Sequence, residues 1–155
     1  MIHRGEDVFN LLKINDTSGM AQFPPNVAEL LEMEFVSYDD EEKVIQARMP
    51  IKPEFNNPFH ITFGGTYAMY FDMAFGPFSG LVTQAATTSL DLNITYIKPL
   101  TVKDEYVDVK AYVVSQSKQY LNVRGEAYKG NNILVATATS RMMIFDPMRM
   151  LKAIK

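Results

Sequence analysis

The sequence predicts an α+β domain in which a curved antiparallel sheet wraps one long apolar helix. Residues 63–76, FGGTYAMYFDMAFG, form a stretch too long, too apolar and too poor in β-branched residues for a strand. Most of the chain after residue 89 instead alternates apolar and polar residues, the period of strands. Since a helix that is apolar nearly all round must be covered on most sides, a curved sheet around it is the economical arrangement.

Length and composition restrict the class of protein. A chain of 155 residues can bury one core and gives no reason to expect two domains. We therefore interpret residues 1–155 as one domain, with a helical extension over 1–32 and a tail over 147–155. The net charge of −3 argues against a nucleic-acid partner, and the lack of cysteine excludes disulfides, thiolate nucleophiles and cysteine-ligated metals.

The same composition gives an expectation for location. No segment approaches the roughly 18 uninterrupted apolar residues of a membrane span, and the first residues carry charges where a secretory signal needs an apolar core. We therefore expect a cytoplasmic protein with no membrane role.

The N-terminal third predicts two short helices and a hairpin. Val8, Leu11 and Leu12 have the spacing of a helix face. The second helix, within residues 24–35, is expected to be capped by Asn26 with Glu29 in capping-box position. The strand patterns MEFVSY and KVIQARMPI then flank the acidic turn DDEE, which predicts a hairpin.

The remaining elements follow in order. The long helix should open at the Gly64-Gly65 pair and weaken at Gly76-Pro77, because proline removes a backbone hydrogen bond. Four strands follow, SLDLNITYI, YVDVKAYVV, YLNVRGEAY and ILVATATSRMMIF, and their short connections favour antiparallel neighbours. In the tail, Met148, Leu151 and Ile154 share one side of a short amphipathic helix, expected to pack on the domain or on a neighbour.

Asp72 is the one acidic or basic side chain between Glu54 and Asp91. It could satisfy a neighbouring polar group, which is the ordinary role of a buried carboxylate. An unpaired buried charge costs several kcal/mol, however, so such a residue tends to have a partner or a task. The functional alternative is a general base or a nucleophile.

The glycine pair gives the second half of a possible site. At a helix N-terminus, Gly64 and Gly65 would expose N–H groups that can hold the oxygen of a polarised carbonyl, although such a pair is also common in plain turns. Gly64 and Asp72 are eight residues apart, about 12 Å along a helix. One reacting carbonyl cannot lie about 3 Å from both, so a shared substrate requires a donor from a second copy. The spacing therefore predicts a dimer with a shared site.

Three segments together resemble a known family. They are the Asn57-x6-Gly64-Gly65-x6-Asp72 spacing, TTSLDLNITYIKPL and GEAYKGNNILVATATS. Over roughly residues 33–146 the chain resembles the hotdog-fold acyl-CoA thioesterases, in the branch that includes phenylacetyl-CoA thioesterase. The resemblance implies a long helix wrapped by an antiparallel sheet, paired into dimers or tetramers. It also implies an acyl-CoA substrate with no metal and no cofactor, coenzyme A being part of the substrate.

The resemblance assigns roles by position. The catalytic carboxylate, as nucleophile or as base for water, falls on Asp72. The oxyanion donors fall on the Gly64 amide and the Asn57 side chain, which in the family come from the subunit opposite the carboxylate. An accessory hydroxyl falls on Ser89, with Thr88 adjacent.

Other candidate site residues depart from the family pattern or have weaker support from the sequence. Phe63 stands where the family usually has histidine, and His60, three residues earlier, is a possible substitute although it is expected in a loop. We also expect Gly65 to contact the substrate. Lys118 and Arg141 lie near strand ends or turns, where they could meet coenzyme A phosphates.

Two other functions are alternatives to hydrolysis. In the hydratase branch a histidine follows the aspartate by five residues, and that position here is Pro77, which argues against dehydration. A non-catalytic acyl-CoA or fatty-acyl binding protein remains the alternative, and the sequence leaves the acyl group open.

Overall fold

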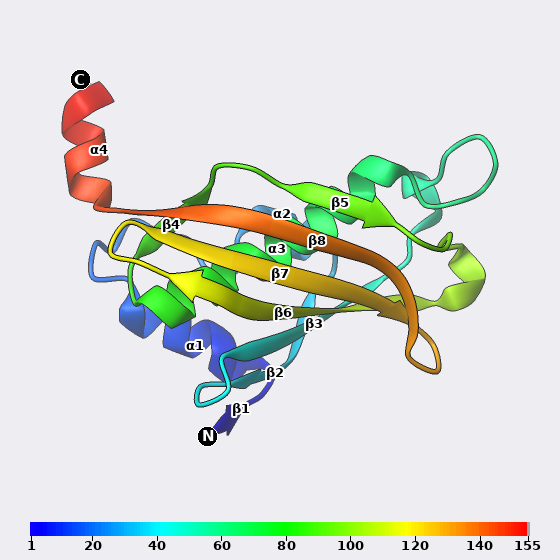
Figure 1. Ribbon diagram of the computed structural model, residues 1–155, viewed down its shortest axis with the longest axis horizontal. Coiled ribbons are helices and arrows are strands. Elements are labelled where there is room, and N and C mark those ends of the chain that lie inside the picture. Colours follow the sequence, from blue (N-terminus) through cyan, green and yellow to red (C-terminus); the bar gives the residue numbers. More distant parts are fainter. Residues whose placement is uncertain (155) are drawn as a thin grey trace.

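The computed structural model describes residues 1–154. They form an antiparallel sheet with one long helix packed against it (Figure 1). The sheet has eight strands in the order β1-β2-β3-β6-β7-β8-β4, and β5 also pairs with β8. The central helix α3 spans Gly64–Thr83. This confirms the predicted α+β class, a long helix with a curved antiparallel sheet and short N-terminal helices.

The two N-terminal helices are present, and one detail of the second was predicted wrongly. Helix α1 spans Glu6–Asn15 and α2 spans Asn26–Leu30, while the two-residue strand β1 (Ile2–His3) pairs with β2. The N-cap of α2 is Pro25 and no side chain caps the helix. Asn26 is already inside the helix, and its side-chain oxygen accepts a hydrogen bond from Gln22. Proline fixes an extended backbone just before the helix, which moves the start by one residue.

The predicted strands form with few changes. The hairpin consists of β2 (Glu34–Asp39) and β3 (Val44–Pro50), and β3 continues the sheet by pairing with β6 (Tyr106–Gln116). Strands β7 (Tyr120–Lys129) and β8 (Ile133–Phe145) follow as antiparallel neighbours. Register shifts interrupt β2–β3, β6–β7 and β7–β8, and such irregularities bend strands and allow a sheet to curve.

The expected strand over residues 89–97 is divided in two. Strand β4 (Ala86–Ser89) and strand β5 (Asn93–Tyr96) pair with different parts of β8, and residues 90–92 between them leave the ladder. The Asp91 carboxylate accepts a hydrogen bond from the Arg141 amide, and the Asp91 carbonyl accepts one from Ser140. These bonds replace strand pairing at the break. Alternation along SLDLNITYI would put Leu90 and Tyr96 on one apolar face, yet both are exposed in the single chain.

Helix α3 continues seven residues past Gly76, so the predicted weakening at Pro77 was wrong. Proline cannot donate to the carbonyl one turn earlier. That carbonyl belongs to Met73. The Ser79 hydroxyl instead lies 2.7 Å from the Phe75 carbonyl oxygen and 2.8 Å from that of Gly76, the local back-bonding of a helical serine. Phe75 and Phe78, on either side of Pro77, are fully buried. Tertiary packing therefore holds the helix through a residue that locally disfavours it.

The helix approaches the sheet closely at Gly125 in β7. A Cβ atom at this position would lie 2.7 Å from the ring of Phe75 and 3.0 Å from that of Phe71. Glycine is required here because the two aromatic rings occupy the volume of a side chain. This contact fixes the helix against the middle of the sheet, with Phe71 and Phe75 in the core.

The tail forms helix α4 (Pro147–Ile154), which projects from the end of β8 away from the sheet (Figure 1). Met148, on the predicted apolar side, and Met150 are exposed in the single chain, so packing of the tail on a neighbour stays a prediction. The side chains of Leu151 and Ile154, predicted on the same apolar side, lie outside the described part. Among the helices described, none has the length and hydropathy needed to cross a membrane.

Candidate active site

The Asp72 carboxylate has a hydrogen-bonded partner from the sheet. Ser89 Oγ donates to Asp72 Oδ1 at 2.6 Å, which joins the middle of α3 to the end of β4. The distance lies in the range of O–H···O hydrogen bonds. About two turns further along the helix, the hydroxyls of Ser79 and Thr87 lie 2.7 Å apart. Strand β4 therefore presents Thr87 and Ser89 to the helix.

Asp72 is exposed in the single chain, contrary to the expectation of a buried carboxylate. The sheet covers only one side of α3. Gly65, Met69 and Gly76, which share the Asp72 side of the helix, are also exposed or half-buried. The apolar composition of α3 therefore does not mean that the chain itself covers the helix on all sides.

Asn57 is held in a tight loop before α3. Its Oδ1 accepts hydrogen bonds from the amides of Phe59 at 2.9 Å and Ile61 at 3.2 Å. Because the side-chain oxygen is used inside the loop, the Nδ2 group is the end left to donate. Within residues 1–154, Nδ2 has no hydrogen-bond acceptor, so a ligand could provide one.

The first turn of α3 also has amides without a hydrogen-bond acceptor. Phe63 is the N-cap, and among the described residues the Gly64 and Gly65 amides donate to no acceptor. The Tyr96 hydroxyl from β5 donates to the Gly64 carbonyl at 2.9 Å and fixes this turn from the other side. Asn57 and Gly64 thus give two unused donors close to the helix start.

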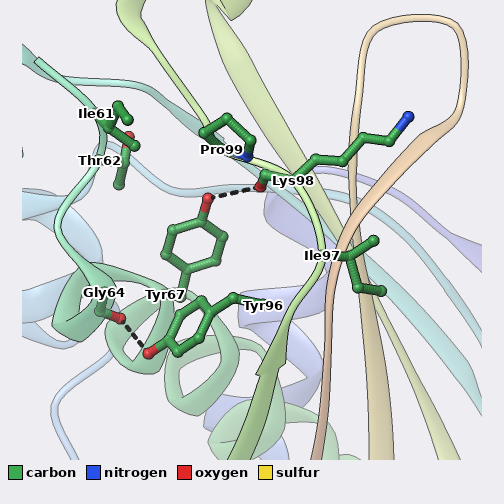
Figure 2. Close-up of a pocket in the computed structure, with 8 residues that line it drawn as sticks. All are labelled: Ile61, Thr62, Gly64, Tyr67, Tyr96, Ile97, Lys98 and Pro99. Atoms are coloured by element: carbon green, nitrogen blue, oxygen red, sulfur yellow. Dashed lines mark hydrogen bonds between the residues drawn. The ribbon is translucent and has the colours of Figure 1, made fainter.

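A hollow of about 340 Å³ adjoins this helix start (Figure 2). Tyr67 and Tyr96 form one wall, with their rings edge-to-face at 5.2 Å, and Thr62 and Pro99 also line it. Burial raises the pKa of Tyr67 to about 12, so its hydroxyl stays protonated and donates to the Lys98 carbonyl. In Figure 2 the Lys98 side chain points away from the two tyrosines.

Sequence reasoning did not assign the two tyrosines to a site. Strand alternation in SLDLNITYI puts Tyr96 on an apolar face, and Tyr67 is one of many apolar and aromatic residues of the long helix. The i, i+3 spacing of Gly64 and Tyr67 was the available signal, because it puts both residues on one side of the helix start.

Two predicted residues before the helix are exposed. His60 lies in the loop, as expected, with a left-handed backbone (φ 59°), and its amide donates to the Asn57 carbonyl. The Phe63 side chain is 60% exposed, and its ring lies against Gly65, where an added Cβ would approach within 2.9 Å. Phe63 therefore excludes any larger residue at position 65 in this arrangement.

Thr88 does not join the Asp72–Ser89 pair. It is exposed and alternates along β4 with Thr87 and Ser89, which face the helix. Successive side chains of a strand point to opposite faces, so Thr88 lies on the outer face of the sheet. Its role in substrate binding stays a prediction.

The two predicted basic residues lie away from α3. Lys118 is exposed in the turn between β6 and β7. Arg141 alternates on β8 with the buried Ser140 and Met142, which puts it on the outer face of the sheet. Its guanidinium donates to Asn122 Oδ1 at 3.1 Å. Neither residue contacts Asp72 directly.

The site thus consists of two halves on one helix. Asp72 and Ser89 lie at the middle of α3, whereas Asn57 and Gly64 lie at its start, eight residues away or about 12 Å along the axis. In the described chain no hydrogen bond links the two halves. Nor do its His, Asp and Glu side chains form a group of three or more that could hold a metal ion.

The fold has many solved counterparts. One is a phenylacetic acid degradation-related protein from Ralstonia eutropha JMP134, with 23% identity, a TM-score of 0.75, and coverage of 86% of this chain and 98% of that one. Another is the PaaI protein from the phenylacetic acid degradation operon of E. coli, with 18% identity, a TM-score of 0.73, and coverage of 90% and 96%. Thioesterase HI1161 from Haemophilus influenzae has 16% identity, a TM-score of 0.71, and coverage of 88% and 90%. At these identities the likeness establishes the shared hotdog fold.

The sequence itself matches a family. No curated protein sequence matches the chain. The family profile described as the Thioesterase superfamily matches residues 59–136, half of the chain. The matched region contains the start of α3, Asp72 and Ser89. The chain therefore belongs to the thioesterase superfamily.

Proposed function

We propose that this protein hydrolyses an acyl-CoA thioester to the free acid and coenzyme A. The carrying observation is the Asp72 carboxylate, which is accessible and is oriented by the 2.6 Å hydrogen bond from Ser89. Membership of the thioesterase superfamily supports thioester hydrolysis as the class of reaction. The acyl-CoA substrate and the residue roles below are parts of the proposal.

In the proposed mechanism the thioester carbonyl lies between Asp72 and two donors. Asn57 Nδ2 and the Gly64 amide donate to the carbonyl oxygen and stabilise the negative charge that develops there. Asp72 then has two routes. It either takes a proton from water, which attacks the carbonyl carbon, or attacks the carbon itself to give an anhydride that water hydrolyses. In both routes the C–S bond breaks and the thiolate of coenzyme A leaves and gains a proton.

The donors are proposed to come from a second copy of the chain. The separation of about 12 Å along α3 prevents Asn57 and Gly64 from reaching a carbonyl next to Asp72 of the same chain. Strand β5 supports this assembly, because among the described residues it pairs only with β8 and its other edge is free. Tyr96 and the neighbouring Ile97 are exposed there. A homodimer would cover this apolar edge, and pairing of dimers into tetramers remains a further prediction.

Other positions are proposed to contact the substrate. His60, Phe63 and Gly65 adjoin the Asn57 loop and the helix start, where the substrate would pass from one subunit to the other. Lys118, in the turn between β6 and β7, and Arg141, on the outer face of the sheet, are proposed as contacts for the phosphates of coenzyme A because both are exposed cations. Hydrolysis by this route needs no cofactor. A cytoplasmic location also stays a prediction.

The activity is tested by thiol release from a panel of short, medium, long and aryl acyl-CoAs. Wild-type protein should release coenzyme A from at least one member. Asp72→Ala should lower kcat by about 10²- to 10⁴-fold, the usual contribution of a positioned base. No hydrolysis of any member would refute the enzyme proposal, and full activity of the variant would refute the assigned mechanism.

The shared site is tested by mixing two inactive variants, Asn57→Ala and Asp72→Ala. In a twofold-symmetric dimer each hybrid restores one of its two sites, so random exchange should return about a quarter of wild-type activity. Different affinity tags on the two variants would prove that hybrids form. Proven exchange without any recovery would contradict a site built from two subunits.

A second candidate function is acyl-CoA binding without turnover. The observation that favours it is Phe63, a side chain with no hydrogen-bonding group at the N-cap next to the proposed oxyanion donors. This alternative predicts a saturable binding isotherm for acyl-CoA with no release of thiol. Calorimetric titration beside the thiol-release assay separates the two functions.

A further inference from the structure

A second cavity lies at the other end of α3, away from the Asn57 loop. Its volume is about 290 Å³. Leu12 and Phe23 from the N-terminal extension, Gly80 from α3, Ala86 from β4 and Phe145 from β8 contribute to its lining. The cavity is thus closed on one side by a segment outside the matched family region, which begins at residue 59.

Two glycines lie on the surface of α3 between Asp72 and this cavity. Asp72, Gly76 and Gly80 are spaced by four residues, so they lie along one ridge of α3. A Cβ at Gly76 would meet no atom within 4 Å. A Cβ at Gly80 would only touch Leu12 at 3.5 Å and the Ala85 carbonyl at 3.8 Å. The ridge therefore leaves room for an elongated ligand between the carboxylate and the cavity.

Two estimates of the distance from Asp72 to the cavity agree. Along the helix, the eight residues from Asp72 to Gly80 span about 12 Å. Along β4, the three residues from Ser89, which touches Asp72, to Ala86 in the cavity lining span about 10 Å. An extended hydrocarbon with C–C bonds of about 1.5 Å advances about 1.3 Å per bond. Eight to ten acyl carbons, as a rough length on the same basis, reach from a thioester at Asp72 into the cavity.

The lining also favours one kind of chemical group at the far end of the acyl chain. No lysine, arginine or histidine is among the described residues that line the cavity, and its two carboxylates are already engaged. Asp16 accepts hydrogen bonds from the amides of Ser18 and Ala21, and Asp146 accepts one from the amide of Met148. A second carboxylate at the end of an acyl chain would meet two like charges, and Arg149, which is outside the lining, already pairs with Asp146 at 3.8 Å. A neutral methyl end suits this lining, since burying apolar surface is favourable.

We propose that this cavity binds the methyl end of the acyl chain and that the substrates are medium-chain, unbranched monocarboxylic acyl-CoAs. The inference rests on the proposed thioesterase function, because it uses Asp72 as the position of the thioester. It adds a chain-length limit set by the cavity at the C-terminal end of α3, where Leu12 and Phe23 of the N-terminal extension form one wall.

The first test is the chain-length profile of kcat/KM over straight acyl-CoAs from four to sixteen carbons. The maximum should fall at eight to ten carbons, at least tenfold above both ends of the series. Acyl-CoAs of the same length with a terminal carboxylate should react at least tenfold more slowly. A flat profile, or a maximum at four or at sixteen carbons, overturns the inference.

Gly76→Leu tests the ridge. The side chain enters open space, and leucine favours a helix more than glycine does, so the variant should fold. Its ratio of ten-carbon to four-carbon kcat/KM should fall at least tenfold. Gly130→Leu is the matched control, because Gly130 also has no atom within 4 Å of its Cβ position but lies in the turn between β7 and β8. An unchanged ratio in Gly76→Leu overturns the inference.

Binding separates this inference from the proposed function. Calorimetry with the unreactive thioethers S-decyl-CoA and S-butyl-CoA should give a Kd at least tenfold lower for the decyl compound, and Gly76→Leu should remove the difference. That result without any acyl-CoA hydrolysis would leave the cavity proposal standing and refute catalysis. Hydrolysis with equal binding of both thioethers would refute the cavity proposal alone.

Discussion

Removal of the Ser89 hydroxyl should slow the reaction without abolishing it. Ser89 donates to Asp72 at 2.6 Å, and a hydrogen bond to a charged group contributes about 1.5–3 kcal/mol. Because Asp72 is exposed, water can replace part of this bond, so we take the lower end of the range. A cost of about 1.4 kcal/mol corresponds to a tenfold effect on rate. Ser89→Ala should therefore lower kcat about tenfold and leave KM nearly unchanged.

The assay is steady-state thiol release by wild type, Ser89→Ala, Asp72→Ala and the double variant. If Ser89 acts only by orienting the carboxylate, its loss should cost nothing further once Asp72 is absent, so the two effects should not add. Thr139→Ala is a control, because it removes an exposed hydroxyl from β8 on the face of the sheet opposite the buried Ala138 and Ser140.

Two results would refute this reasoning. Full activity of Ser89→Ala would mean that the hydrogen bond does not orient the reacting carboxylate. Additive losses in the double variant would mean that Ser89 acts on the substrate independently of Asp72. A thermal unfolding curve for each variant separates both outcomes from a change in stability.

Three further predictions concern the frame of the site. Gly125→Ala should lower the free energy of unfolding by about 1–3 kcal/mol in urea titration, because the new methyl would enter the Phe75 ring. Tyr96→Phe should lower the free energy of unfolding by about 0.5–1.5 kcal/mol, because it removes the hydrogen bond that fixes Gly64. It should also lower kcat more than it raises KM. Asp104→Asn should lower Tm at pH 7, with a difference that disappears in acid. Desolvation raises the pKa of Asp104, yet hydrogen bonds from Thr101 and Lys129 outweigh it and hold the pKa below 3.8. Asp104 therefore stabilises the fold above that pH and loses this contribution as the pH falls below it.

Each of these predictions has a control and a contrary result. Gly130→Ala, with no atom near its Cβ position, should leave stability unchanged, and an equal loss in both glycine variants would remove the packing explanation. A Tyr96→Phe enzyme with wild-type kcat would show that the first turn of α3 needs no such support. A Tm difference for Asp104→Asn that persists well below pH 3.8 would mean that its carboxylate charge is not the cause.

Local pattern predicted most of the fold. The period of two identified β6, where Val107, Val109 and Ala111 are all buried, and the apolar run identified α3. These succeeded because side-chain alternation and helix periodicity are properties of neighbouring residues. The prediction at Pro77 was wrong because tertiary packing outweighs a local effect. The effect of the proline is local, whereas the burial of Phe75 and Phe78 that keeps the helix intact is tertiary.

The sequence by itself determined the order of the elements and the spacing of Asn57, Gly64 and Asp72, because these depend on position along the chain. Only the tertiary structure decided which groups meet. It brought Ser89 to Asp72, put Thr88 on the outer face, joined Tyr96 to Gly64 and left Asp72 exposed. The physical reason is that strand register and helix packing set these contacts between segments that are distant in sequence.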